Sequence, residues 1–108
     1  MEQLDEKIKQ AETLLTQEKY DEAFAIFTEC ANQDNSDACN YLGWCYQNGK
    51  GCQQSDETAF SWYEKSAQLG NAAGQNNLGS CYYFGQGCKQ NIDVAFIWYT
   101  KAAKQGDM

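Results

Sequence analysis

Two stretches of the chain repeat one another at a spacing of 36 residues. Residues 38–70 read ACNYLGWCYQNGKGCQQSDETAFSWYEKSAQLG, and residues 74–106 read GQNNLGSCYYFGQGCKQNIDVAFIWYTKAAKQG. Of the 33 aligned positions, 16 are identical. Self-similarity at a fixed period of this length is typical of proteins that stack one small unit. The repeat therefore decides the fold class before any other feature of the sequence.

Each copy has the pattern of a helical hairpin. Apolar residues fall at helical spacing in two segments of the first copy, which are Leu42, Cys45 and Tyr46, and then Ala59, Trp62, Tyr63 and Ala67. Gly49 and Gly51 follow the first segment, where glycine favours the left-handed conformation that ends a helix. Residues 1–37 fit a shorter hairpin without the glycine loop. We expect helices near 3–16, 20–32, 37–48, 56–69, 73–84 and 91–105.

The composition excludes much chemistry. The chain has 108 residues, no His and no Pro, and its eight basic residues are all lysines. Without histidine it lacks the commonest metal ligand and the usual base near neutral pH. No Cys-x-x-Cys pair is present to begin a zinc site. We therefore predict that the protein is not an enzyme and holds neither a metal nor a cofactor.

The charge is concentrated at one end. The net charge is −7, and residues 1–37 carry ten acids against three lysines, whereas the rest of the chain carries five of each sign. This acidity argues against direct binding to nucleic acid or to an anionic membrane. The acidic N-terminus differs from a signal peptide, and the longest apolar run, residues 94–99, is far too short to span a bilayer. We expect a cytoplasmic protein.

The repeated strings resemble the Sel-one-like repeat (SLR), a relative of the tetratricopeptide repeat. The resemblance rests on LGWCY at 42–46, GKGC at 49–52 and WYEKSA at 62–67, and on their second copies. Residues 1–37 resemble a plain tetratricopeptide hairpin. The resemblance implies an all-α solenoid of three antiparallel hairpins, at 1–35, 36–70 and 71–107, in a right-handed superhelical stack. It also implies a single domain that binds other proteins.

In tetratricopeptide-like stacks the first helix of each hairpin lines a concave groove. The resemblance transfers this role to Asp5, Ile8, Glu12 and Leu15 in the first hairpin, to Asn40, Trp44, Gln47 and Asn48 in the second, and to Asn76, Ser80, Tyr83 and Phe84 in the third. Trp44, Tyr83 and Phe84 would be apolar anchors, and Asn40, Gln47 and Asn76 would hydrogen-bond a peptide. Asp5 and Glu12 would attract basic residues, so the expected partner is a basic or amphipathic segment.

Trp44 is the main candidate anchor. Its counterpart in the second copy is Ser80, whereas Trp62 recurs as Trp98, so the framework does not require an indole at position 44. Exposed aromatic residues are common anchors of binding energy. The alternative is that Trp44 fills a gap against the neighbouring hairpin.

The last repeat is unusually apolar for the end of a stack. Where the second hairpin has Asp56, Thr58 and Ser61, the third has Ile92, Val94 and Ile97. An end repeat normally presents a polar outer face. We therefore expect this face to be covered, either by a second copy of the chain or by another protein. The alternative is that these side chains pack inward.

Six cysteines bracket turns between helices. They are Cys30, Cys39, Cys45, Cys52, Cys81 and Cys88. They are either buried thiols or disulfides. A secreted, cysteine-rich SLR subgroup described from Helicobacter ties successive helices with disulfides and is linked to β-lactam binding. If the cysteines pair in that way and a leader was removed, the protein is secreted or periplasmic.

Two other functions stand beside the groove-binding hypothesis. The charge of residues 1–37 suits an acidic inhibitor that occupies the basic surface of a nucleic-acid-binding protein. The resemblance to the cysteine-rich subgroup implies a secreted protein that binds β-lactams. Charge reversal in the first hairpin separates the first of these from groove binding.

Overall fold

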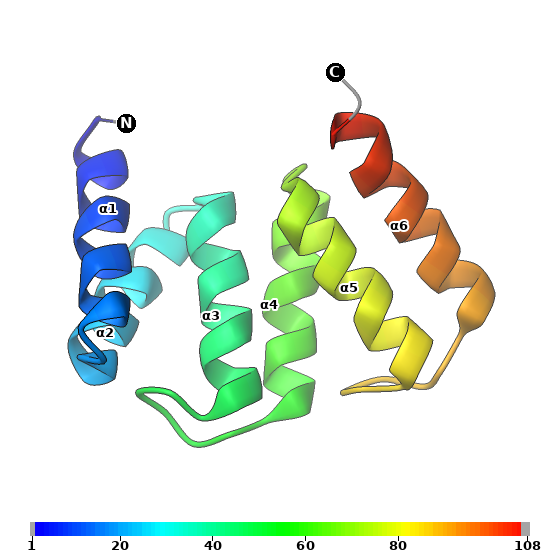
Figure 1. Ribbon diagram of the computed structural model, residues 1–108, viewed down its shortest axis with the longest axis horizontal. Coiled ribbons are helices and arrows are strands. Elements are labelled where there is room, and N and C mark those ends of the chain that lie inside the picture. The colour runs from blue at the N-terminus through cyan, green and yellow to red at the C-terminus, as the bar shows by residue number, and fades with distance from the viewer. Residues whose placement is uncertain (1, 107–108) are drawn as a thin grey trace.

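The computed structural model describes residues 2–106 and contains six helices in this range (Figure 1). They are α1 (Glu2–Thr16), α2 (Tyr20–Ala31), α3 (Ser36–Asn48), α4 (Asp56–Gln68), α5 (Ala72–Phe84) and α6 (Ile92–Gly106). The helices agree with the expected segments to within one or two residues, which confirms the three-hairpin solenoid. Residue 107, the end of the expected third hairpin, lies outside the described range. None of the six helices combines the length and apolarity needed to cross a membrane.

Side chains and glycines fix the helix ends. The side chains of Asn35, Ser55 and Asn71 accept hydrogen bonds from backbone N–H groups in the first turns of α3, α4 and α5. Gly49 and Gly85 end α3 and α5 with φ of 65° and 70°, a conformation that disfavours other residues. The two SLR copies therefore begin and end their helices by the same means.

Each of the two SLR hairpins closes by packing a tyrosine ring against a glycine. A Cβ atom added to Gly43 would lie 2.5 Å from the ring of Tyr63, and one added to Gly79 would lie 2.9 Å from the ring of Tyr99. Only glycine permits so close an approach of the two helices. Buried Phe27 and Leu42 lie in the core between the first two hairpins, and buried Leu78 packs with Tyr63 in the next core.

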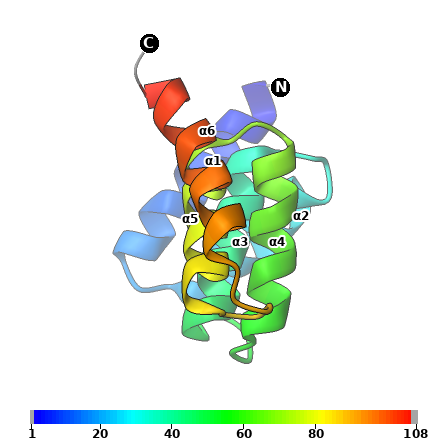
Figure 2. The ribbon, with the colours of Figure 1, turned by 90° about the vertical axis from the view of Figure 1, so that its right-hand side faces the viewer.

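Adjacent hairpins join through a repeated aromatic contact. The rings of Phe24 and Tyr46 lie 5.6 Å apart and those of Phe60 and Tyr82 lie 5.4 Å apart, both in edge-to-face geometry. At each of these two joints the glycine loop of the next hairpin also folds back, so that Gly51 lies against Phe24 and Gly87 lies against Phe60. In Figure 2, α2 and α4 lie on one side of the stack and α5 lies on the other.

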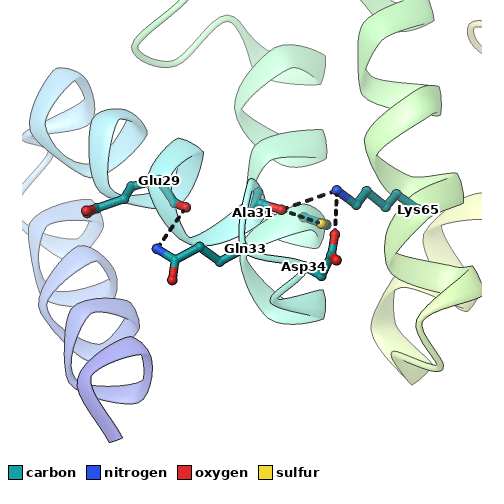
Figure 3. Close-up of polar contacts among 6 residues, drawn as sticks. Glu29, Ala31, Gln33, Asp34 and Lys65 are labelled. Atoms are coloured by element: carbon teal, nitrogen blue, oxygen red, sulfur yellow. Dashed lines mark hydrogen bonds and ion pairs between the residues drawn. The ribbon is translucent and has the colours of Figure 1, made fainter. Parts of the chain in front are cut away.

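A lysine adds a polar contact between the first two hairpins. Lys65 of α4 places its Nζ 3.0 Å from a carboxylate oxygen of Asp34 and donates a 3.3 Å hydrogen bond to the carbonyl oxygen of Ala31 (Figure 3). Ala31 is the last residue of α2, and Asp34 lies in the turn between α2 and α3. Gln33 in the same turn donates to the carbonyl oxygen of Glu29. Lys65 therefore adds a second donor to a carbonyl group at the end of a helix, which already accepts a hydrogen bond from the backbone N–H of Asp34.

Candidate protein-interaction surface

One edge of the molecule carries the exposed aromatic side chains of the first helices. The α1–α2 turn, the α3–α4 loop and the α5–α6 loop all lie at this edge, which is the lower one in Figure 1. Trp44, near the end of α3, is 36% exposed, and Tyr83 and Phe84, at the end of α5, are 38% and 65% exposed. We call this region the loop edge. The three predicted aromatic anchors therefore lie at the same edge of the stack.

Trp44 lies against the preceding hairpin without being buried by it. Its ring centroid is 6.4 Å from that of Tyr20, at an angle of 44°. The ammonium of Lys50 lies 4.9 Å from the centroid of the Tyr20 ring. The indole thus packs on a neighbour, as the gap-filling alternative expected, and still presents part of its ring to solvent.

An acidic hollow lies beside this aromatic pair. It has a volume of about 310 Å³, opens to solvent, and is lined by Glu18, Lys19, Tyr20, Asp21 and Glu22. Three of these five side chains are carboxylates, so the hollow suits a cationic group. Our sequence analysis missed Tyr20 and these acids as site residues. The signal was available, because the segment 17–20 stands where the other hairpins have glycine loops.

Two of the amides predicted to bind a peptide have internal partners instead. Asn40 accepts a 2.8 Å hydrogen bond from Asn77 and so links α3 to α5. Gln47 accepts from the hydroxyl of Tyr63 at 2.8 Å and donates to Gln86 at 3.2 Å. Their hydrogen-bonding groups hold the stack together. The third predicted amide, Asn76, is exposed.

The predicted groove positions of α1 differ in their surroundings. Ile8 is buried in the core, so its assignment to the groove is wrong. Leu15 is half-buried and packs on the same core. Glu12 accepts a hydrogen bond from the hydroxyl of Tyr41, and burial together with this carboxylate raises the pKa of Tyr41 to about 12. Asp5 is exposed.

The C-terminal helix presents apolar side chains to solvent. Ile92, Phe96 and Ile97 are 39%, 56% and 54% exposed, whereas Val94 is half-buried. The alternative of inward packing therefore fails for Ile92 and Ile97 and holds in part for Val94. Whether a second copy covers this face stays a prediction.

The six cysteines are free thiols in the structure. Cys30, Cys39, Cys45 and Cys81 are buried, whereas Cys52 and Cys88 are half-buried in the glycine loops. Burial raises the pKa of Cys45 and of Cys81 to about 12. Protonated thiols are poor nucleophiles and poor metal ligands. This arrangement suits small core residues, and the oxidation state in the cell stays a prediction.

Comparison with known proteins agrees with this architecture. The Sel1 repeat family model matches residues 36–71 and 72–107, two in-register copies that together make up most of the chain. The chain belongs to the Sel1 repeat family. Sel1 repeats typically mediate protein–protein interactions. None of the curated proteins compared with the chain matches it.

Three solved structures show the same fold. A Sel1 repeat protein from Oxalobacter formigenes superposes with a TM-score of 0.85 at 35% identity over 92% of this chain. A protective antigen of uropathogenic Escherichia coli with an SLR fold gives a TM-score of 0.77 at 36% identity over 81% of the chain. Cysteine-rich protein B of Helicobacter pylori gives 0.75 at 27% identity over 78%. This Sel1 chain spans 39%, 19% and 63% of those proteins, respectively.

Proposed function

We propose that this Sel1 repeat chain is a non-enzymatic module that binds a protein segment along the loop edge. The segment would carry a basic residue next to an apolar one. The observation that carries the proposal is the position of Trp44, partly exposed and packed on Tyr20, which lines the acidic hollow. The apolar residue would pack on the indole, and the basic residue would enter the hollow between Glu18 and Glu22.

Comparison of the two repeats supports a binding role for Trp44. In the second hairpin the hydroxyl of Tyr63 donates to Gln47, and in the third the hydroxyl of Tyr99 lies 3.0 Å from that of Ser80, the counterpart of Trp44. Each of these two tyrosine hydroxyls therefore has a partner without help from the indole. Since neither the repeat nor its hydrogen bonds need tryptophan here, its exposed face is available to a partner.

The rings at the end of α5 supply a second contact. Tyr83 and Phe84 lie 4.9 Å apart in edge-to-face geometry. They follow Trp44 along the loop edge, because α3 and α5 are neighbouring first helices. An extended segment that crosses the loop edge would meet the acidic hollow first, then Trp44, and then this aromatic pair. Its charge would complement the acids of the first hairpin and speed association.

A selection from a random peptide display library tests the proposal. The expected peptides pair Lys or Arg with an apolar or aromatic residue, and Trp44→Ala should weaken their binding at least tenfold by calorimetry. Leu69→Ala is the matched control, because Leu69 is 44% exposed and lies outside the loop edge. Peptides that bind wild type and Trp44→Ala equally would contradict the proposal.

Charge variants separate this function from that of an acidic inhibitor. Glu18→Lys/Asp21→Lys changes the hollow, whereas Asp5→Lys/Glu6→Lys changes exposed acids of α1 that do not line it. Specific recognition predicts that only the first pair weakens binding. Equal losses from both pairs, with a steep salt dependence and no effect of Trp44→Ala, would instead indicate a general electrostatic blocker.

A further inference from the structure

The outward face of α6 resembles the faces of α2 and α4 that the following hairpin covers. Phe24 of α2 and Phe60 of α4 each lie under a tyrosine and a glycine loop of the following hairpin. Phe96 of α6 is the equivalent residue of the third hairpin, 36 positions after Phe60, and it is 56% exposed. The face around it is therefore an apolar helix surface whose two internal counterparts are both covered.

The surroundings of Phe96 form one continuous stripe. Six residues of α6 line an open hollow of about 370 Å³, and they are Asp93, Phe96, Ile97, Thr100, Lys101 and Lys104. We call these residues the α6 stripe. Its centre is apolar, its N-terminal end carries an acid, and its C-terminal end carries two bases. The order of charges along the stripe follows the sequence of α6, with Asp93 first and Lys101 and Lys104 last.

The N-terminal end of the stack does not match this stripe. The exposed side chains of α1 within the described residues are all polar, and they are Gln3, Asp5, Glu6, Lys9, Gln10, Thr13 and Thr16. Head-to-tail stacking would bury Phe96 and Ile97 against this polar face. The tyrosines and glycine loops that cover Phe24 and Phe60 are already used within the chain. Among the described helices, the surface that best matches the α6 stripe is the α6 stripe of another copy.

We propose that two copies of this chain associate through antiparallel pairing of their α6 stripes. Asp93 and Lys101 are eight residues apart, which is about 12 Å along a helix, and Ile97 lies midway between them. A two-fold axis at Ile97 therefore sets Asp93 of each copy against Lys101 of the other. Phe96 and Ile97 meet their own counterparts at the centre. The stripe is self-complementary in this orientation, as a closed two-fold interface requires.

The charge distribution of the chain also permits this dimer. The net charge of −7 comes entirely from residues 1–37, and residues 38–108 carry five acids and five lysines. α6 lies at the opposite end of the stack from α1 (Figure 1). Pairing through α6 therefore keeps the two acidic hairpins apart, so that their repulsion is screened by salt over the intervening distance.

The mass of the full chain in solution tests the proposal. Sedimentation equilibrium is expected to give twice the 12.2 kDa chain mass, and Ile97→Asp is expected to give the single chain mass. Ile97 is exposed, so this variant should stay folded by circular dichroism. Leu69→Asp, at an exposed site outside the stripe, is the control and should stay dimeric. Trp44→Ala should also stay dimeric, which separates this test from that of the loop edge.

A charge swap distinguishes antiparallel pairing from other contacts. Asp93→Lys and Lys101→Asp each place like charges together across the two-fold axis, so each should weaken the dimer at least tenfold. The double variant restores opposite charges and should restore the dimer. A wild-type monomer at all concentrations would overturn the proposal. So would larger assemblies, a charge swap that fails to restore the dimer, or a foreign protein bound to the stripe of a monomer.

Discussion

The repeats 36–71 and 72–107 share a framework and differ in what lies next to them. Tyr63 of the inner repeat is buried, whereas its counterpart Tyr99 is half-buried. Phe60 lies under the following hairpin, whereas Phe96 is 56% exposed. Residues of the same type at the same register thus have different surroundings. The difference shows that burial in this stack is set by the neighbouring hairpin as much as by the repeat itself.

The largest expected effect comes from removing the tyrosine ring of the inner repeat. Tyr63→Ala empties a buried site beside Gly43 and leaves Gln47 without its donor, which should lower the free energy of unfolding by about 3–5 kcal/mol. Tyr99→Ala removes a half-buried ring and should lower it by about half as much. Urea unfolding of both variants measures this difference. Equal losses would mean that the terminal repeat is as well covered as the inner one.

The sequence alone was enough to predict the fold because the repeat specifies it twice. Gly43 meets Tyr63 inside one hairpin, and their identical counterparts Gly79 and Tyr99 meet inside the next, so a pattern within one copy predicts a contact in both. The candidate site was harder to predict. Register places Asn40 and Gln47 on the groove side, but it does not show that Asn77 and Tyr63 already bind them.

The acidic hollow escaped prediction for a related physical reason. It is formed where the first hairpin departs from the repeat, at the short turn after α1. No second copy of that turn exists for comparison. Its contact with Trp44 joins residues 24 positions apart in different hairpins. Comparison of the repeats thus identifies residues, such as Trp44, that the repeated fold does not require. The structure is needed to show which residues of other hairpins lie next to them.

A smaller effect is expected at the α5–α6 glycine loop, which packs against α4 of the preceding repeat. A Cβ atom at Gly87 would lie 2.2 Å from the backbone oxygen of Asp56, and φ is +73°. Gly70 has φ of +92° and nothing within 4 Å of an added Cβ atom. Gly70→Ala should therefore cost only the left-handed strain of about 1 kcal/mol, whereas Gly87→Ala should cost about 2–3 kcal/mol because backbone must also move.

Thermal unfolding of the two glycine variants isolates the contact between the repeats, since the left-handed strain is common to both. A lowered melting temperature for Gly87→Ala relative to Gly70→Ala would assign the difference to the joint between α4 and the α5–α6 loop. If the two melting temperatures match, the loop shifts without loss of packing, and the other contacts of the joint, such as that between Phe60 and Tyr82, maintain it.

The smallest expected effect concerns the lysine that both repeats conserve in sequence but use differently. Both ammonium groups lie over a tryptophan ring, that of Lys65 at 5.5 Å and that of Lys101 at 4.6 Å from the ring centroid. Lys65 also pairs with Asp34, whereas Lys101 has Gly70 at the position equivalent to Asp34. The ion pair of Lys65 is exposed to solvent, so Lys65→Met should lower the free energy of unfolding by only about 0.5–1 kcal/mol. In the monomeric Ile97→Asp background, where Lys101 has no partner from a second copy, Lys101→Met should change it by less than about 0.5 kcal/mol.

Asp34→Asn completes a double-mutant cycle with Lys65→Met and measures the coupling free energy of the pair. A coupling that falls as salt is raised would show that Lys65 stabilises the joint between hairpins through charge. A coupling near zero would leave the hydrogen bond to the carbonyl oxygen of Ala31 as the reason for a lysine at this position. The contact that recurs in the last repeat is that of the ammonium with the ring of the tryptophan three residues earlier, which is Trp62 for Lys65 and Trp98 for Lys101.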